Sequence, residues 1–80
     1  MNNTITMDKL EVGQSAVLTE LNTKGDMRRR FIDLGLIEGT TVVCVGKSPA
    51  GDPKAFLIKG AVIAIREDDS KGITVKCLKN

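Results

Sequence analysis

The chain is short and nearly balanced in charge: it has 80 residues, of which 41% are hydrophobic and 28% charged, and a formal net charge of +2. This length predicts one small folded domain rather than a disordered chain. The weak net charge provides no strong field for a polyanion, and two phenylalanines without Trp or Tyr cannot build a base-stacking surface or a groove for proline-rich peptides. Composition therefore disfavours nucleic acid and proline-rich ligands.

The N-terminal part is expected to contain a flexible tail and an ordered lead-in. Residues 1–6 lack the basic and apolar regions of a signal peptide, and we expect them to be flexible. In the lead-in over 7–14, Leu10 and Val12 are spaced for one face and Gly13 marks a turn. Since no stretch approaches the roughly 20 apolar residues of a membrane span, we expect a soluble protein without membrane insertion.

The next elements are a strand and the clearest helix of the chain. Residues 16–21 predict a strand whose inward face is left open, because both faces carry apolar side chains. The helix is predicted from an apolar stripe at i, i+4 and i+7, formed by Met27, Phe31 and Leu34. We predict Asp26 as its N-cap and Gly35 as its left-handed stop, after which Leu36 folds back on Phe31.

The remaining pattern is typical of a β protein. Four more strands are expected, over residues 40–46, 55–58, 61–66 and 73–78. Lys59-Gly60 predicts a tight hairpin, the two prolines within 47–54 predict an exposed loop, and the polar run 67–72 predicts a connection with one helical turn. The strand over 40–46 is apolar on both faces, which suggests a wrapped sheet. We therefore predict a mainly β fold, a small SH3-like β-barrel of about five strands with one short α-helix after the first strand.

No catalytic or metal site stands out. The chain has no histidine, phosphate loop or nucleophile elbow, and we expect no enzyme activity and no catalytic residue. A closed zinc site needs four N or S ligands, whereas the chain offers two thiols, which we expect to be reduced and buried. The run Glu67–Asp69 is conceivable as a weak oxygen-rich site but is typical of a solvated turn. The low-ranking metal candidates are Cys44, Cys77, Asp68 and Asp69, and we expect no cofactor beyond weak Fe(II) or other divalent binding.

The densest basic cluster is the run Arg28–Arg30. On a helix these side chains fan out at about 100° steps and cannot share one face. We expect Arg29 to pair with Asp33 one turn on, and Arg30 to lay its stem over the core. Two interpretations stay open: a solvated helix face, or an arginine-bearing face that docks a protein partner.

Several segments together resemble a known family. Residues 30–40 with the apolar run 42–45 resemble the "R…LGL…G…V.V" core of the ferrous iron transport protein A (FeoA) family. Residues 10–17 resemble its opening, and 55–65 with 73–75 resemble its closing strands, so that the likeness covers residues 7 to 78.

The resemblance implies a single SH3-like domain over residues 7–80, in the bacterial cytoplasm. It also implies a non-enzymatic accessory role in ferrous iron uptake, in which the chain binds the cytoplasmic region of an FeoB-like transporter with its GTP-binding domain. The barrel resembles the C-terminal domain of iron-dependent repressors as well, so a regulatory module or a direct metal sensor or carrier stays open. Residues 67–72 depart from the family's frequent Ala-containing stretch, which leaves the local geometry there open.

The helix and its following loop, from Met27 to Gly39, form our hypothesised docking surface, because they are the family's most recognisable segment. The candidate partner-binding residues are Met27, Arg28, Arg29, Leu36, Ile37 and Glu38. Whether the chain activates, stabilises or regulates the transporter, and its oligomeric state, stay open.

Overall fold

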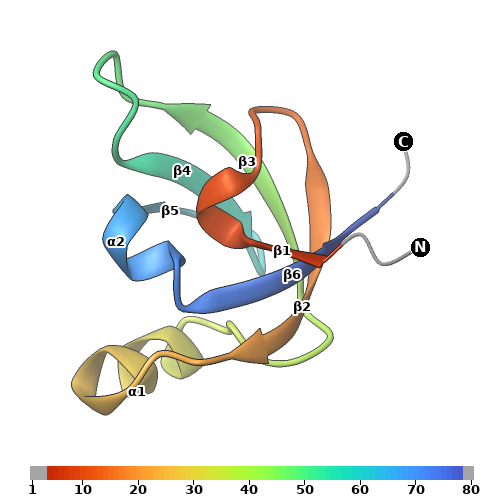
Figure 1. The fold of residues 1–80 in the computed structure, drawn as a ribbon, viewed down its shortest axis with the longest axis vertical. Helices are drawn as coiled ribbons and strands as arrows, with labels where there is room; N and C mark the ends of the chain where they lie inside the picture. Colours follow the sequence, from red (N-terminus) through yellow and green to blue (C-terminus); the bar gives the residue numbers. More distant parts are fainter. Residues whose placement is uncertain (1–3, 79–80) are drawn as a thin grey trace.

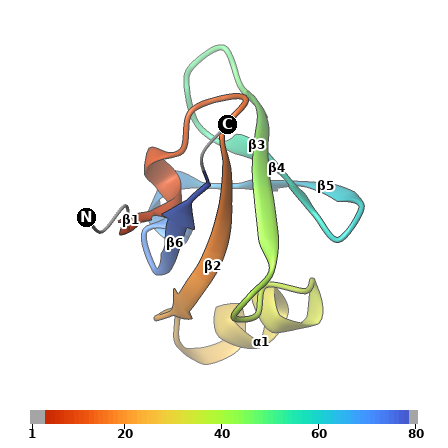
Figure 2. The same ribbon diagram turned by 90° about the vertical axis from the view of Figure 1, so that its right-hand side faces the viewer.

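The computed structural model describes residues 4–78, which form a curled antiparallel sheet with short helices at its ends (Figure 1). In chain order the elements are β1 (Thr4–Thr6), the 3-10 helix η1 (Met7–Lys9), β2 (Ser15–Leu21), α1 (Gly25–Asp33), β3 (Thr41–Lys47), β4 (Lys54–Ile58), β5 (Ala61–Ile65), α2 (Glu67–Ser70) and β6 (Ile73–Cys77). The six strands of this sheet lie in the order β1-β6-β2-β3-β4-β5. The sheet curls so that the β4–β5 hairpin crosses β2 and β3, and α1 lies across one end of the molecule (Figure 2).

The hydrophobic core fills the inside of this curl. Its buried residues are Met7, Leu10, Ala16, Leu18, Phe31, Leu36, Val42, Cys44, Phe56, Ile58, Ile65, Ile73 and Val75. Strand β2 turns Ala16 and Leu18 inward, which decides the face that the sequence left open. Strand β3 buries Val42 and Cys44 but exposes Val45, so its apolar pattern on both faces does not mean that both faces are covered. Only one face of the sheet packs on the core here.

The N-terminal region differs most from the prediction. Thr4–Thr6, which we placed in a flexible tail, form a strand that pairs with β6, so that Ile5 lies opposite Val75. Residues 1–3 lie outside the described part. The helix α1 consequently follows the second strand rather than the first, and the sheet has one strand more than expected. Three residues are too few to give a recognisable strand pattern in the sequence. They form a strand because β6 offers an edge to which they can pair.

The lead-in is anchored by backbone contacts rather than by one apolar face. Leu10 is buried, whereas Val12 is 52% exposed, so the prediction that they share a face was wrong. The reason is the turn that follows, where the Gly13 N–H donates to the Cys44 carbonyl at 2.7 Å and directs Val12 outward. The Lys54 ammonium donates to the carbonyls of Asp8 and Leu10 at 2.8 and 2.6 Å, which fastens η1 to β4.

The second half of the chain follows the prediction. Lys59 and Gly60 form the hairpin turn with φ of 52° and 84°, the left-handed pair of a type I′ turn. The loop before β4 is exposed at Pro49 and Ala50, as its prolines indicated. The predicted helical turn is α2, and the Asp52 carboxylate accepts a hydrogen bond from its first N–H, that of Glu67, at 2.8 Å.

Candidate functional site

The start of α1 differs from the predicted cap. Lys24 occupies the N-cap position without a side-chain hydrogen bond, and Gly25 follows it with a φ of +69°. Asp26, our predicted N-cap, lies instead in the first turn of the helix. That prediction was wrong because the chain enters α1 through a left-handed glycine, two residues earlier than the apolar stripe indicated. The carboxylate of Asp26 still lies near the positive end of the helix dipole.

The end of α1 is the predicted left-handed stop. Gly35 has a φ of +100°, its N–H donates to the Ile32 carbonyl at 3.0 Å, and the Leu36 N–H donates to the Phe31 carbonyl at 2.9 Å. These are the two bonds of a Schellman motif, in which a hydrophobic contact accompanies the turn. Leu36 and Phe31 are both buried in the core, as expected. The Thr40 hydroxyl donates to the Gly35 carbonyl at 2.8 Å and holds the loop after the helix.

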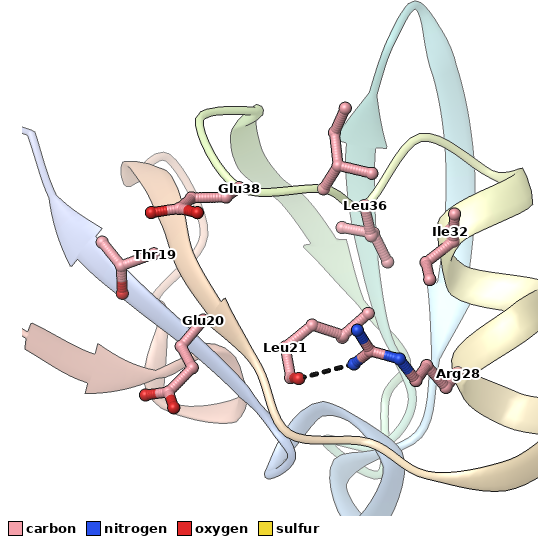
Figure 3. A pocket seen from close by; sticks show the side chains of 8 residues that line it. Thr19, Glu20, Leu21, Arg28, Ile32, Leu36 and Glu38 are labelled. Atoms are coloured by element: carbon pink, nitrogen blue, oxygen red, sulfur yellow. Dashed lines mark hydrogen bonds between the residues drawn. The ribbon is translucent and has the colours of Figure 1, made fainter.

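This stop creates a shallow groove beside the helix, which we call the helix–loop groove (Figure 3). Its volume is about 240 Å³, and it is lined by Thr19, Glu20, Leu21, Arg28, Ile32, Leu36, Ile37 and Glu38. One wall comes from β2 and the loop and carries the carboxylates of Glu20 and Glu38, while α1 contributes Arg28 and Ile32 to the other wall. Ile32 is 39% exposed and Ile37 48% exposed, so apolar side chains face solvent between charges of both signs.

Arg28 joins the two walls of this groove by a hydrogen bond. Its Nη1 donates to the carbonyl of Leu21 at 2.8 Å, which joins the first turns of α1 to the end of β2 (Figure 3). The hydrogen bond orders a long side chain that would otherwise sample many rotamers at an exposed position. The guanidinium therefore stands in a defined place at the groove, with further N–H groups available for a partner.

The predicted docking residues do not all line one groove of α1 and its loop. Arg28, Ile37 and Glu38 meet at the helix–loop groove, as one surface. Leu36 also lines it but is fully buried, so this candidate is a core residue at the floor rather than an exposed contact. Met27 lies on the side of α1 that faces β5.

Arg29 lies next to the helix–loop groove rather than in it, on a surface that it shares with Asp33 and with Arg28 and Ile32. The predicted ion pair between these two residues is absent, since within residues 4–78 the ion pairs join Lys71 to Glu67 at 3.6 Å and to Asp68 at 3.9 Å. An exposed pair of this kind gains little in water, which explains why the predicted spacing alone does not hold it. Arg30 is exposed and lines a surface together with Met27, Phe31 and Leu34.

Sequence reasoning missed several groove residues. Glu20 and Thr19 come from β2, and nothing in their local pattern distinguishes them from other strand residues. Ile32 carried a weak signal, because it is an apolar residue on the helix outside the stripe of Met27, Phe31 and Leu34.

The four metal candidates do not meet. Cys44 is fully buried, and its thiol donates to the Gly46 carbonyl at 3.7 Å, while Cys77 is half-buried on β6; both are free thiols. Asp68 is exposed and pairs with Lys71, and Asp69 is half-buried. Over the described residues, no three Cys, Asp or Glu side chains gather in a way that could hold a metal ion. In the same part of the chain, no helix combines the length and apolar character needed to cross a membrane.

The architecture is that of a small SH3-like domain. The FeoA of Stenotrophomonas maltophilia, solved with zinc and described as a prokaryotic SH3 domain protein, matches it with a TM-score of 0.75 and 28% identity over 89% of this chain and 88% of that one. The fold also matches IdeR of T. acidophilum, with a TM-score of 0.79 and 21% identity over 92% of this chain and 34% of that chain, a likeness of fold alone. The predicted fold class is confirmed.

The family model for the FeoA domain matches residues 5–77, and the chain therefore belongs to the FeoA domain family. The solved FeoA protein of Chlorobium tepidum has a TM-score of 0.88 and 31% identity over 94% of this chain and 71% of that chain. A curated relative is the Fe(2+) transport protein A/Fe(2+) transporter FeoB fusion protein of Porphyromonas gingivalis, 26% identical over 92% of this chain. The chain spans 9% of the length of that fusion protein.

Proposed function

We propose that this chain is a non-enzymatic, cytoplasmic accessory protein of bacterial ferrous iron uptake that binds the cytoplasmic region of an FeoB-like transporter, with its GTP-binding domain, through the helix–loop groove. The observation that carries the proposal is the Porphyromonas gingivalis fusion, in which FeoA and FeoB parts belong to one protein. A covalent link keeps two modules at high effective concentration, so a fused arrangement is favoured where the two must touch. We infer that an FeoA domain makes this contact through its own surface.

The helix–loop groove has the chemistry of such a contact. Protein interfaces combine apolar anchors at the centre with polar and charged groups at the rim, and arginine is enriched in them. Ile32 and Ile37 supply exposed apolar anchors, and Arg28 supplies a guanidinium held by its bond to the Leu21 carbonyl. Because Arg28 is ordered before a partner arrives, less side-chain entropy is lost on binding.

The proposal includes no resident metal or cofactor. It is supported by the finding that, among residues 4–78, no three Cys, Asp or Glu side chains gather where a metal ion could bind. An anaerobic Fe(II) titration of the labelled chain, followed by NMR, tests this part. Line broadening that saturates at one equivalent around the cysteines or the acidic run would contradict it.

Binding to the transporter is tested with the purified cytoplasmic region of the FeoB-like protein from the same organism, by calorimetry. We expect Ile37→Asp to lower the affinity at least tenfold, because it places a charge among the apolar anchors of the groove. The matched control is Val12→Asp, which makes the same kind of change at an exposed apolar residue in the loop between η1 and β2, at the far end of β2 from α1 (Figure 2). This control should change the affinity less than twofold, and an unaltered affinity for folded Ile37→Asp would move the interface elsewhere.

A further inference from the structure

A second groove lies on the other side of α1, between this helix and strand β5. We call it the α1–β5 groove and define it by Met27, Phe31 and Leu34 of α1 and Ile63, Ala64 and Ile65 of β5. Its volume is about 270 Å³. Figure 2 shows α1 at one end of the molecule, below the level of the β4–β5 hairpin. Its walls are thus an apolar helix face and a strand.

Strand β5 is an edge of the sheet, because within residues 4–78 it forms a ladder with β4 alone. Ile58 and Ala61 flank the two-residue turn and are opposite each other, which makes them a hydrogen-bonded pair. Bonded and non-bonded pairs alternate along an antiparallel ladder, so the N–H and C=O groups of Val62 and Ala64 point away from β4. The open edge of β5 therefore presents backbone donors and acceptors at Ala64, which lines the groove, and at Val62 next to it.

Within Ala61–Ile65 this edge carries no charged side chain, proline or bulge. Natural edge strands carry charged side chains, prolines or bulges that discourage pairing with another chain. Strand β5 consists of Ala, Val, Ile, Ala and Ile, its ladder with β4 is regular, and Val62 is 65% exposed. The opposite edge, β1, is only three residues long and carries two threonines. The long, apolar edge is the one that faces the groove.

The rim of the α1–β5 groove is basic. Arg30 of α1 and Arg66 at the end of β5 line it with one acidic residue, Asp69. Both arginines are exposed, and neither takes part in an ion pair within the described residues. Two guanidinium groups against one carboxylate leave the rim with an excess of positive charge. Guanidinium groups bind carboxylates through paired N–H donors, so this charge selects acidic partners.

We propose that the α1–β5 groove binds an extended, acidic segment of a partner protein, which adds as a strand to β5. A strand pairs at about 4.8 Å from its neighbour, and its side chains alternate between the two faces. Every second side chain of the segment then enters the apolar space between Ile63 and Phe31, and carboxylates reach Arg30 and Arg66. This inference does not depend on the transporter as the partner, and it concerns a different face of α1 from the helix–loop groove.

The test uses the full chain labelled with ¹⁵N and a capped peptide of alternating Glu and Val residues, EVEVEVE, with KVKVKVK as the matched peptide of opposite charge. We expect saturable shifts at Met27, Leu34 and residues 63–66, and amide exchange at Val62 and Ala64 slowed at least tenfold by the acidic peptide. The basic peptide should bind at least tenfold more weakly. Equal binding of both peptides, shifts centred on another surface, or unprotected Val62 and Ala64 amides would overturn the proposal.

Two sets of variants test separately whether the peptide pairs with the backbone of β5 and whether its charge contributes to binding. Ala64→Pro removes an outward N–H without removing a bond to β4, and should weaken binding of EVEVEVE at least tenfold. The double variant Arg30→Gln, Arg66→Gln should also weaken binding of EVEVEVE at least tenfold. Its control is Arg29→Gln, Lys76→Gln, which makes the same change of charge at exposed sites outside the groove. This control should change the affinity less than twofold.

Parent-like binding by folded Ala64→Pro would refute strand addition. If that variant does not fold, amide exchange at Val62 and Ala64 in the parent decides the question. Protection of these amides that rises with protein concentration in the absence of peptide would show that a second copy of the chain occupies the edge, and would also overturn the proposal.

Discussion

Replacing Gly35 by alanine tests the structure at the junction of α1, its loop and the β4–β5 hairpin. Gly35 has a φ of +100°, and a Cβ atom added to it would lie 2.6 Å from the Cγ of Lys59, which belongs to the hairpin turn. A left-handed alanine costs about 1–2 kcal/mol. Moving the Lys59 side chain away from its rotamer adds about 0.5–1.5 kcal/mol. We therefore expect Gly35→Ala to reduce the free energy of unfolding by about 2–3 kcal/mol.

Urea unfolding followed by circular dichroism measures this loss, and thermal unfolding provides a second reading. For a domain of this size, each kcal/mol lowers the melting temperature by about 4–8 °C. The matched control is Gly39→Ala, since Gly39 has a similar φ of +93° and no atom within 4 Å of an added Cβ. The free energy of unfolding of Gly39→Ala should fall only by the cost of a left-handed alanine, about 1–2 kcal/mol.

Two results would refute this reasoning. An unchanged melting temperature for Gly35→Ala would mean that the residue is not a left-handed stop. Equal losses for Gly35→Ala and Gly39→Ala would mean that the contact with Lys59 carries no cost. A double-mutant cycle with Lys59→Gly checks the second point, because removing the lysine side chain should recover part of the loss at Gly35.

Further predictions concern other contacts of the fold. Lys54→Met leaves the carbonyls of Asp8 and Leu10 without their donor and should cost about 1–3 kcal/mol in urea unfolding, whereas Lys47→Met at an exposed site should be nearly neutral. Thr40→Val removes the bond from a buried hydroxyl to the Gly35 carbonyl and should cost about 1 kcal/mol; an unchanged stability would mean that this bond does not hold the loop. Cys77, half-buried, should react with an aromatic disulfide reagent at least tenfold faster than the buried Cys44, and equal rates measured on single-cysteine variants would contradict the burial of Cys44.

The differences between the predicted and the observed site follow from distance along the chain. The arginine run was predicted to fan out around the helix, and the structure shows where each member points: Arg28 lines the helix–loop groove, Arg29 lies beside Arg28, and Arg30 lines the α1–β5 groove. Arg28 acquires its position from the carbonyl of Leu21. No pattern on the helix itself predicts that partner, because it depends on where β2 ends in space.

The sequence by itself determined the features that depend only on residues close together in the chain. Gly35 is the residue that takes a left-handed φ at low cost, and Lys59-Gly60 between two apolar runs predicts a type I′ hairpin. The prolines of the loop before β4 and the period of the α1 stripe act over similarly short distances. Backbone sterics and local periodicity decide these features, so they can be recognised before any fold is known.

Only the tertiary structure decided which distant groups meet. The curl of the sheet gives Thr4–Thr6 a partner in β6, chooses the inward face of β2, and leaves β5 as an edge beside α1. It also brings Glu20 and Glu38 to the same wall of the helix–loop groove, opposite Arg28. The physical reason is that a strand's pairing and its buried face depend on the neighbours that the whole sheet supplies, and those neighbours lie as many as 72 residues apart, as in the pairing of Thr4 with Lys76.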